Sequence, residues 1–261
     1  MKGIILAGGL GTRLHPLTKI ASKQLLPIFD KPLIYYPLST LILSGIRDIL
    51  IISSSSHIEK FRNLLDGGEK FGIKIEYKLQ NEPKGIADSL ILGEEFLNGE
   101  KCALILGDNI FNGPGLGRKL AQFKEVEGAH IFGYHVKNPE AYGVAKLHDK
   151  QKVIELIEKP TNKNSKTAIP GLYFLDEYAT SFAKEIEYSA RGELEILDVL
   201  RKYLHNDSLT LEMLPRGTAW FDSGTFEDMH DASSYVRLMQ ERTGEIVGDP
   251  IEASRIQGWI Q

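Results

Sequence analysis

The sequence lacks what several classes of protein require. Its single cysteine, Cys102, excludes an internal disulfide and a cysteine metal cluster. Lys and Arg number 31 against 35 Asp and Glu, a net charge of −4, so no excess of positive charge is available to neutralise a nucleic-acid backbone. No apolar run approaches the ~20 residues that span a bilayer, and the apolar start is too short for a signal peptide. We therefore expect a cytoplasmic protein with neither nucleic acid nor membrane as a partner.

What is present is an ordinary globular composition, 42% hydrophobic and 25% charged. In the first half, short apolar runs alternate with amphipathic stretches. We expect strands at 3–7, 48–52, 74–80 and 103–106, and helices at 33–44, 58–65 and 86–97. This rhythm predicts parallel strands with helices on both faces, and ligands at the carboxyl ends of the strands.

The rhythm changes after about residue 129, where strands follow one another through short turns. We expect strands at 129–135, 143–148, 153–158, 167–174, 209–213 and 218–221, and helices at 177–185, 193–204 and 225–240. The simplest organisation is one α/β domain over residues 1–243, in two halves that meet near residue 128. A short tail, 244–261, follows.

A glycine-rich turn, Gly8-Gly9-Leu10-Gly11-Thr12-Arg13, directly follows the first strand. Glycines there allow a tight bend and bring backbone N–H groups close to a phosphate. A dinucleotide fingerprint would need glycine where Leu14 stands, and the Gly-Lys-Ser/Thr ending of a Walker A loop is absent. With Arg13 and, further on, Lys23, the turn suits a triphosphate. The alternative is a simple strand-to-helix turn with a surface arginine.

Two aspartates follow apolar strands in the same way. The run Leu106-Gly107-Asp108-Asn109 ends an apolar strand and places Asp108 at its carboxyl end, and Asp222 follows Trp220-Phe221 before a glycine turn. Carboxylates at strand ends suit Mg²⁺, a hard cation, and the two could converge on one metal. Gly-Asp-Asn is also good turn chemistry, and Asp222 has the alternative of capping the helix that begins near Thr225.

Other polar residues are less informative. Glu158 and Lys159 close a predicted strand, where they could grip a hydroxyl and a phosphate or be ordinary strand-end residues. His57, His130 and His135 have no ligand spacing with a cysteine or with each other, so a zinc site is not expected.

Taken together, these motifs resemble those of the sugar-nucleotide pyrophosphorylases, narrowed to the glucose-1-phosphate thymidylyltransferases. The matching segments are 3–14, 22–27, 30–39, 106–109, 142–144, 158–160, 171–174 and 190–196. The resemblance runs in order along the chain from residue 1 to about residue 260. Together the segments are far more specific than the first loop alone.

The resemblance implies a reaction: dTTP and α-D-glucose 1-phosphate give dTDP-glucose and pyrophosphate, with Mg²⁺, as a first step of dTDP-rhamnose-type deoxysugar synthesis. It implies a three-layer α/β/α, Rossmann-like nucleotidyltransferase fold with a mixed, mainly parallel sheet, and a homotetramer. The first half would bind the nucleotide and the second the sugar phosphate.

The resemblance also assigns roles to individual residues. The triphosphate would lie on Gly8, Gly9, Gly11, Thr12 and Arg13, beside Lys23, and the thymine on Gln80 and Gly85. Asp108 and Asp222 would hold the metal. The sugar would be bound by Gly143, Glu158 and Ile169, and its phosphate by Lys159 and Arg191.

The chemistry agrees with these roles. A sugar phosphate is already an anionic nucleophile near neutral pH, so catalysis needs positioning and charge neutralisation, which Arg13, Lys23, Lys159, Arg191 and a metal would supply. Two alternatives stay open. One is the same chemistry with UTP or another sugar 1-phosphate, since thymine and uracil differ by one methyl group. The other is a non-catalytic sensor of nucleotide sugars.

Three departures from the family pattern bear on specificity and regulation. Asp88 stands where glutamine is usual, although an aspartate in the first turn of a helix is favourable in itself. Pro170 replaces a threonine and removes a backbone donor. Relatives continue into a helical segment beyond the position of Gln261, from which we expect weakened feedback inhibition by an end-product sugar nucleotide.

Overall fold

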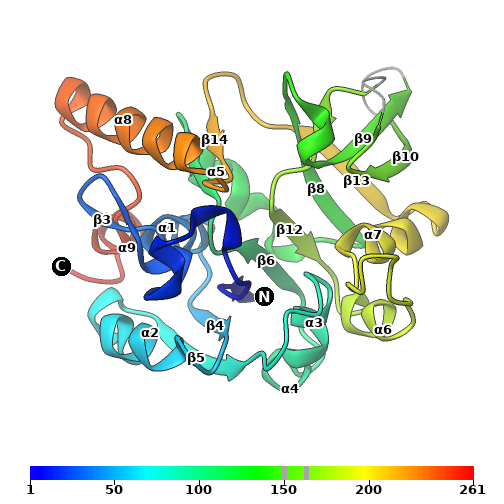
Figure 1. Ribbon diagram of the computed structural model, residues 1–261, viewed down its shortest axis with the longest axis horizontal. Coiled ribbons are helices and arrows are strands. Elements are labelled where there is room, and N and C mark those ends of the chain that lie inside the picture. The colour runs from blue at the N-terminus through cyan, green and yellow to red at the C-terminus, as the bar shows by residue number, and fades with distance from the viewer. Residues whose placement is uncertain (149–151, 162–164) are drawn as a thin grey trace. The chain divides into compact units, whose positions relative to one another are not determined.

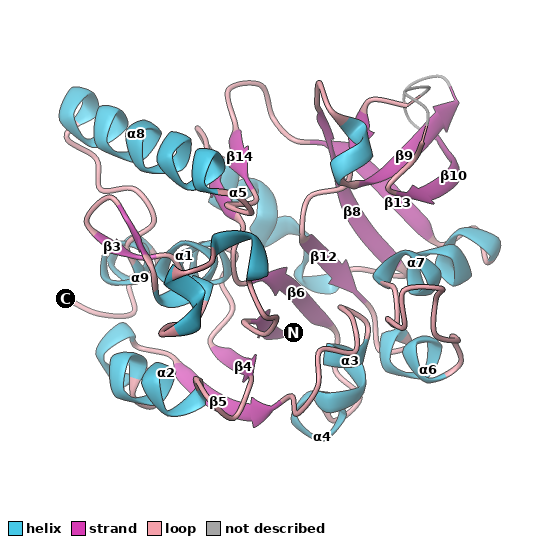
Figure 2. Cartoon of the chain, viewed as in Figure 1, coloured by secondary structure: helices cyan, strands magenta, loops and turns pink. Residues whose placement is uncertain are grey.

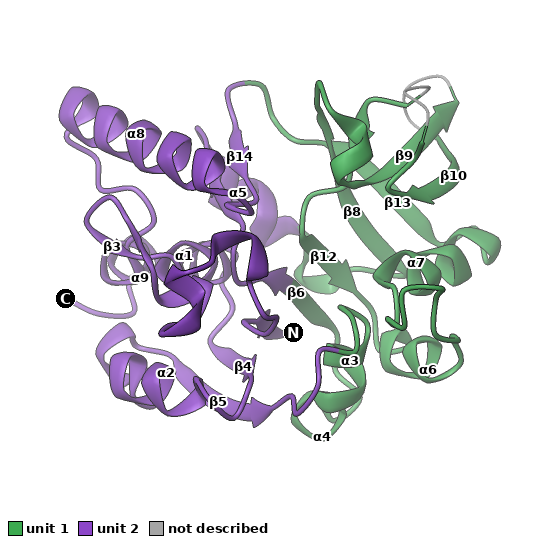
Figure 3. Ribbon diagram, viewed as in Figure 1, with its two compact units in different colours: residues 1, 84–104, 123–216 green, residues 2–83, 105–122, 217–261 purple. Residues whose placement is uncertain are grey.

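The computed structural model describes residues 1–148, 152–161 and 165–261. They form two compact units, each assembled from separate stretches of chain (Figure 3). Unit 1 comprises residues 1, 84–104 and 123–216, and unit 2 comprises residues 2–83, 105–122 and 217–261. The division into contiguous halves near residue 128 stays a prediction.

Unit 2 is organised around three parallel strands (Figure 1). These are β1 (Lys2–Leu6), β4 (Asp48–Ser53) and β5 (Lys74–Leu79). β1 and β4 pair from Gly3↔Ile49, and β4 and β5 pair up to Ser53↔Leu79. The apolar runs predicted these strands because parallel strands covered on both faces are apolar throughout.

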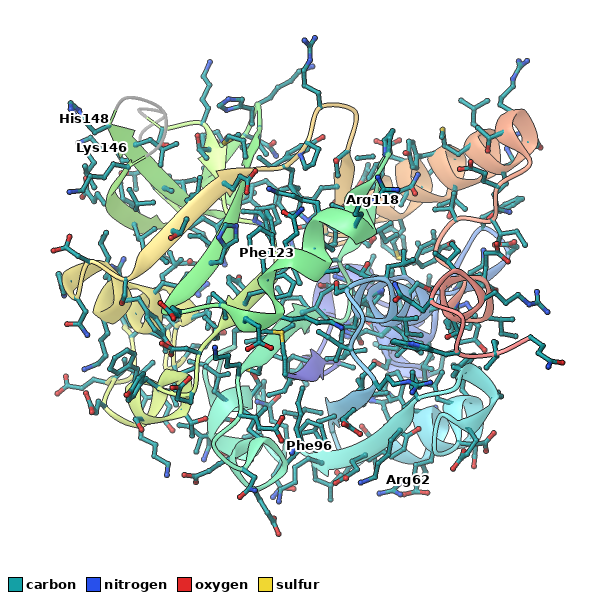
Figure 4. All side chains as sticks on the ribbon, turned by 180° about the vertical axis from the view of Figure 1, so that it is seen from behind. Arg62, Phe96, Arg118, Phe123, Lys146 and His148 are labelled. Atoms are coloured by element: carbon teal, nitrogen blue, oxygen red, sulfur yellow. The ribbon has the colours of Figure 1, made fainter. Side chains whose placement is uncertain are left out.

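The α-helices of unit 2 are drawn in cyan in Figure 2. They are α1 (Tyr35–Leu43), α2 (Ile58–Leu65), α5 (Leu116–Leu120), α8 (Phe226–Thr243) and α9 (Pro250–Ile256). On α2 only Ile58, Phe61 and Leu65 are buried, the spacing of one helix face. Exposed Arg62 lies over the ring of Tyr77 on β5, 4.7 Å from its centroid (Figure 4).

Two short antiparallel ladders in unit 2 were not predicted. One pairs β2 (Pro27–Ile28) with β3 (Lys31–Pro32). The other pairs β7 (Ile110–Asn112) with β14 (Ala219–Phe221), two segments more than 100 residues apart. The second ladder matters for function because its strands are flanked by the two predicted metal-binding aspartates.

Residues 244–261 are packed against the rest of unit 2. Asp249 caps α9 by accepting from the backbone N–H groups of Ile251 and Glu252. The hydroxyl of Ser254 donates to the carbonyl of Phe71 at 2.7 Å, and the guanidinium of Arg47 lies 4.6 Å from the ring centroid of Trp259. This segment therefore contributes to the structure of the unit.

Unit 1 has a mainly antiparallel set of strands. They are β8 (Ala129–His135), β9 (Gly143–His148), β10 (Lys152–Glu158), β11 (Thr167–Ala168), β12 (Leu172–Leu175) and β13 (Leu209–Met213). β10 pairs with β9, β11 with β9 and β8, and β12 with β8, all antiparallel, while β13 joins β8 in parallel. The strand β6 (Cys102–Leu106) begins in unit 1 and ends in unit 2.

The helices of unit 1 are α3 (Asp88–Leu92), α4 (Glu94–Leu97), α6 (Ala179–Lys184) and α7 (Ile196–His205). Between α5 and β8 lies Phe123, whose ring stacks on His130 with centroids 3.8 Å apart (Figure 4). The expectation of an α/β fold with a mixed sheet is confirmed.

Two expected elements differ in detail. The single strand predicted at 167–174 is wrong: β11 and β12 are separate, because Pro170 has no N–H and its carbonyl accepts from Leu172 N at 2.8 Å. The helix predicted at 86–97 is divided at Gly93 into α3 and α4. Among the described residues, no helix has both the length and the apolar character needed to cross a membrane.

Candidate active site

The glycine loop follows the carboxyl end of β1 and is held by a hydrogen bond to a residue further along the chain. Gly9 and Gly11 have φ angles of 96° and 59°, a left-handed conformation that disfavours other residues. The hydroxyl of Thr18 donates to the carbonyl of Gly11 at 2.7 Å, and a Cβ on Gly11 would lie 2.9 Å from the Thr18 methyl. Thr12 and Arg13 then form a 3₁₀ turn with Leu14. Both glycines are therefore required by backbone geometry.

A cavity of about 260 Å³ adjoins this loop within unit 2. Its lining combines the loop with residues that follow β4 and β5: Gly8, Gly9, Leu10, Thr18, Ala21, Ser22, Lys23, Ser54, Ser55, Ser56, His57, Gln80, Asn81 and Pro83. Gln80 is buried, and a Cβ on Gly8 would lie 2.6 Å from its Oε1 atom. The structure thus brings together Gly8, Gly9, Lys23 and Gln80, all predicted to bind the nucleotide.

Lys23 forms an ion pair with Asp108. The Nζ atom lies 2.6 Å from Asp108 Oδ2 and also donates to the carbonyl of Asp222 at 3.4 Å. The other carboxylate oxygen of Asp108 accepts from Asn109 Nδ2 at 2.8 Å, and Asn109 Oδ1 accepts from Trp220 Nε1 at 2.7 Å. Sequence reasoning did not assign Asn109 or Trp220 a role, although both lie in the motifs that it singled out.

The β7–β14 ladder explains why Asp108 and Asp222 meet. Its last register pair is Ile110↔Phe221, so Asp108 precedes one strand and Asp222 follows the other. The alternative role of Asp222 as a helix cap is wrong. Thr225 caps α8 in a capping box with Asp228, whereas Asp222 Oδ1 accepts from Gly224 N at 3.2 Å.

Arg13 reaches the same turn. A Cβ on Gly224 would lie 2.9 Å from Arg13 Nη2, so the guanidinium packs against this glycine. Arg13 and Lys23 therefore bring two positive charges to the turn that carries Asp222. Both belong to unit 2 and come from the segment that contains the glycine loop.

The two aspartates repel each other. Burial raises the pKa of Asp222, the negative charges of Asp108 and Asp228 raise it further, and the ammonium of Lys23 opposes them. A divalent cation would relieve this repulsion, and two carboxylates that leave positions for substrate phosphates are a typical Mg²⁺ donor set. The described residues contain no group of three or more His, Cys, Asp or Glu side chains arranged for a metal. The donors fit a cation shared with bound phosphates.

The predicted sugar-binding residues lie together in unit 1. Gly143 pairs with Glu158 across β9 and β10, and its carbonyl accepts from Ile169 N at 2.9 Å. A Cβ on Gly143 would lie 3.2 Å from Glu158 Oε2. Lys159 follows with a φ of 43°, and its Nζ lies 3.9 Å from Glu158 Oε1.

Arg191 is surrounded by carboxylates. Its Nη2 lies 2.8 Å from Glu195 Oε2, 3.1 Å from Glu193 Oε2 and 3.3 Å from Glu158 Oε1. Burial raises the pKa of Glu158. The positive charge of Arg191 lowers this pKa, and the negative charge of Glu195 raises it further. Sequence reasoning missed Glu193 and Glu195, although both follow Arg191 within the Ala190–Ile196 motif.

Gly85, predicted to read the base, has a φ of 103° and is pressed against Leu194 in unit 1. A Cβ there would lie 2.4 Å from the Leu194 carbonyl oxygen. Leu194 N donates to Lys84 O at 2.7 Å. Asp88 is the first residue of α3 and is buried, so the favourable helical position that we expected is confirmed.

The fold and the comparison with known families place the chain among the nucleotidyl transferases. Residues 2–237 match the family model described as nucleotidyl transferase. The chain belongs to this family, whose members generally depend on a divalent metal.

More specific relatives are found over the full chain. A glucose-1-phosphate thymidylyltransferase of Mycolicibacterium smegmatis is 51% identical over 260 residues, covering 100% of this chain and 90% of the relative. That of Neisseria meningitidis is 47% identical over 261 residues, with 100% and 91% covered. The resemblance to glucose-1-phosphate thymidylyltransferases that the motifs indicated is confirmed.

Solved structures agree. The crystal structure of a Bacillus anthracis protein described as a glucose-1-phosphate thymidylyltransferase, in complex with sucrose, has a TM-score of 0.84 to this chain at 38% identity. The match covers 91% of this chain and 95% of the Bacillus anthracis chain. A UDP-glucose pyrophosphorylase complexed with UDP-glucose has a TM-score of 0.79 at 22% identity and shows the shared fold alone.

Proposed function

We propose that this chain transfers the thymidylyl group of dTTP to α-D-glucose 1-phosphate, giving dTDP-glucose and pyrophosphate. The observation that carries the proposal is the convergence of Lys23, Asp108 and Asp222 in unit 2 beside the glycine loop. Full-length relatives that are glucose-1-phosphate thymidylyltransferases support the same reaction.

In this reaction a phosphate oxygen of glucose 1-phosphate forms a bond to the α-phosphorus of dTTP, and the bond between the α-phosphorus and its bridging oxygen to the β-phosphate breaks. The nucleophile is anionic near neutral pH, so no side chain has to remove a proton. The backbone N–H groups of the glycine loop, Arg13 and Lys23 would bind the triphosphate and stabilise the departing pyrophosphate. This assignment explains why no histidine-based catalytic set is required.

Asp108 and Asp222 would hold Mg²⁺. The cation would supply charge neutralisation at the phosphate oxygens, and Lys23 would hold Oδ2 of Asp108 in place. Asn109 donates a hydrogen bond to Oδ1 of Asp108 and accepts one from Trp220, so the carboxylate has a defined orientation.

The sugar phosphate would be bound in unit 1. Glu158 would accept hydrogen bonds from sugar hydroxyls, next to the backbone of Gly143 and Ile169. Lys159, whose side chain is half exposed, and Arg191 would bind the phosphate. Arg191 already contacts three carboxylates, and its positive charge favours the ionised form of Glu158, in which a carboxylate is the better acceptor.

A second candidate substrate is UTP, because thymine and uracil share the carbonyl and N–H pattern that Gln80 would read. We further propose a homotetramer acting in the cytoplasm, at the start of dTDP-rhamnose-type deoxysugar synthesis.

The direct experiment measures pyrophosphate release over a matrix of dTTP, UTP, CTP and ATP with several sugar 1-phosphates. Highest kcat/KM for dTTP with glucose 1-phosphate supports the proposal, and no release with any pair contradicts it.

A further inference from the structure

The cavity beside the glycine loop has a wall that the proposed reaction does not use. This wall is the segment Ser54–His57, which follows β4 and precedes α2. Four consecutive polar side chains line a cavity that also contains Gln80, Asn81 and Lys23.

The segment starts beside the base-reading glutamine. Ser53 and Leu79 are the last register pair of the parallel strands β4 and β5, and Gln80 N donates to Ser53 O at 2.8 Å. Ser54 and Gln80 are therefore the first residues beyond a shared strand edge. The loop that carries His57 thus borders the part of the cavity assigned to the base, whereas the phosphate ligands come from the segment between Gly8 and Lys23.

Two hydroxyls fix the imidazole. Ser54 Oγ and Ser56 Oγ each lie 3.0 Å from His57 Nδ1, and they lie 2.9 Å from each other. When a serine hydroxyl donates to Nδ1, the proton of the neutral ring is on Nε2, which becomes a directed donor. No side-chain bond from His57 caps α2, so the serines are the described polar partners of its ring.

The surroundings of the ring favour its neutral form. Burial lowers the pKa of His57, and the positive charge of Lys60, one turn along α2, lowers it further. Lys60 Nζ itself donates to the carbonyl of Ile20 at 2.7 Å and so stays near the loop. A neutral imidazole offers one N–H to an uncharged acceptor, whereas an anionic phosphate would favour the protonated ring.

We propose that His57 is a second side chain that reads the base. Its Nε2 donates to O4 of thymine, the carbonyl that cytosine replaces with an amino group, while Gln80 reads the ring N–H and the other carbonyl. The proposal rests on the proposed function for the identity of the nucleotide. It assigns Ser54 and Ser56 as positioning residues that select the tautomer. Cytosine would place the N–H donors of its amino group opposite the N–H donor of His57, so neither group would have an acceptor.

The test uses the full chain with His57→Phe, which keeps a planar ring but removes the donor, and His57→Gln, which restores an N–H. Asn63→Ala is the matched control, because Asn63 is exposed on the same helix and lies outside this cavity. Titration calorimetry measures binding of dTTP, CTP and inorganic pyrophosphate, each without sugar phosphate. Thermal unfolding checks that the variants fold.

We expect His57→Phe to weaken dTTP binding about tenfold, the effect of one lost neutral hydrogen bond in a partly buried site. Pyrophosphate binding should not change, the preference for dTTP over CTP should fall, and His57→Gln should recover most of the affinity. The double variant Ser54→Ala, Ser56→Ala should reduce the same preference several-fold, without a matching loss for pyrophosphate.

Equal losses for dTTP and pyrophosphate would place His57 on the phosphates and overturn the proposal, as would unchanged dTTP binding in His57→Phe. Equal losses for dTTP and CTP would show a role in packing only. If the unsubstituted protein prefers UTP or another pyrimidine triphosphate, the proposed function fails, and the same ratios measured with that nucleotide still decide the role of His57.

Discussion

Lys23 and Asp108, 85 residues apart in the sequence, hold an ammonium and a carboxylate oxygen 2.6 Å apart. The lysine follows the glycine loop and the aspartate follows β6, so one contact connects the segment proposed to bind phosphate to the proposed metal ligands. A cation that binds Asp108 would share this carboxylate with Lys23. The position of the metal and the position of the triphosphate therefore depend on each other.

The first prediction concerns both aspartates. Asp108→Asn and Asp222→Asn keep side-chain shape but remove a charge that would hold the cation. Each variant should fold and lose about 10²–10³ in kcat, the usual cost of one preorganised electrostatic element. Asp231→Asn, on an exposed position of α8, is the control and should retain full activity. Near-normal turnover in Asp222→Asn would remove that residue from the site.

The second prediction is a pH dependence of stability without metal. The pKa of Asp222 is raised above its ordinary value of 3.8, chiefly by burial. Stability linked to this group is fully present below pH 3.8 and is lost as the pH rises through the folded-state pKa. Asp222→Asn should therefore match the unsubstituted protein in acid and have a higher Tm at pH 7, by a few degrees for each ~1 kcal/mol.

Adding Mg²⁺ should reverse that order at pH 7. The cation would stabilise the unsubstituted protein, which keeps both carboxylates, more than Asp222→Asn. Differential scanning calorimetry with chelator and with added Mg²⁺ measures both effects. An Asp222→Asn variant that is less stable than the unsubstituted protein in chelator would contradict the argument from repulsion.

The third prediction concerns the base. The amide of Gln80 can donate to a thymine carbonyl and accept from the ring N–H, whereas cytosine presents a different pattern. We expect use of dTTP and UTP and strong rejection of CTP in steady-state assays. Asp88→Ala is informative, because a carboxylate accepts from the amino group of cytosine. Comparable use of CTP that disappears in Asp88→Ala would make Asp88 a base reader and reject the thymidine assignment.

The fourth prediction separates two glycines of unit 1 with positive φ. Gly85→Ala adds a Cβ that would lie 2.4 Å from the Leu194 carbonyl oxygen, whereas Gly99→Ala meets no atom within 4 Å. A non-glycine residue in such a conformation costs on the order of 1–3 kcal/mol. Gly99→Ala should show that cost alone, and Gly85→Ala should be clearly less stable in denaturant titrations. Equal stability of Gly85→Ala and Gly99→Ala would mean that the backbone around Leu194 can shift to accommodate the added Cβ.

The fifth prediction concerns the arginine among the carboxylates. Arg191→Ala would leave Glu158, Glu193 and Glu195 without their shared cation, so the pKa of Glu158 should rise further. We expect KM for glucose 1-phosphate to increase at least about tenfold, as when a charge-assisted bond of ~1.5–3 kcal/mol is lost, with a smaller effect on KM for dTTP. Arg237→Ala removes an exposed ion pair with Glu241 and should change neither value. A larger effect on dTTP would move Arg191 to the nucleotide.

Part of the candidate site could be predicted because it lies in local motifs. Gly8 to Arg13 directly follow a strand, and three glycines within four positions favour a phosphate-binding turn over a simple turn. Asp108 follows an apolar strand, where ligand-binding residues collect, whereas the role of Gln80 was implied only by the family resemblance. The α/β class followed from alternating apolar runs and helix patterns of sufficient length.

The remainder depended on contacts distant in sequence. β7 and β14 have three residues each, too few for periodicity, so their pairing and the Trp220–Asn109 bond could not be foreseen. Glu193 and Glu195 were assigned no role because nothing in the local sequence showed that Arg191 folds onto them. The predicted strand at 167–174 was too long, because the prediction rested on the apolar character of this segment and did not allow for the missing N–H of Pro170.

The interleaving of the two units has a consequence for biosynthesis. Unit 2 contains residues 2–83 but also residues 217–261, whereas unit 1 is complete at residue 216. On the ribosome, the unit that begins first is therefore the last to be completed. The strands β1, β4 and β5 emerge early and must wait for α8 and α9, while β8–β13 are already available to fold. A nascent chain halted near residue 216 should accordingly protect unit 1 from protease before unit 2.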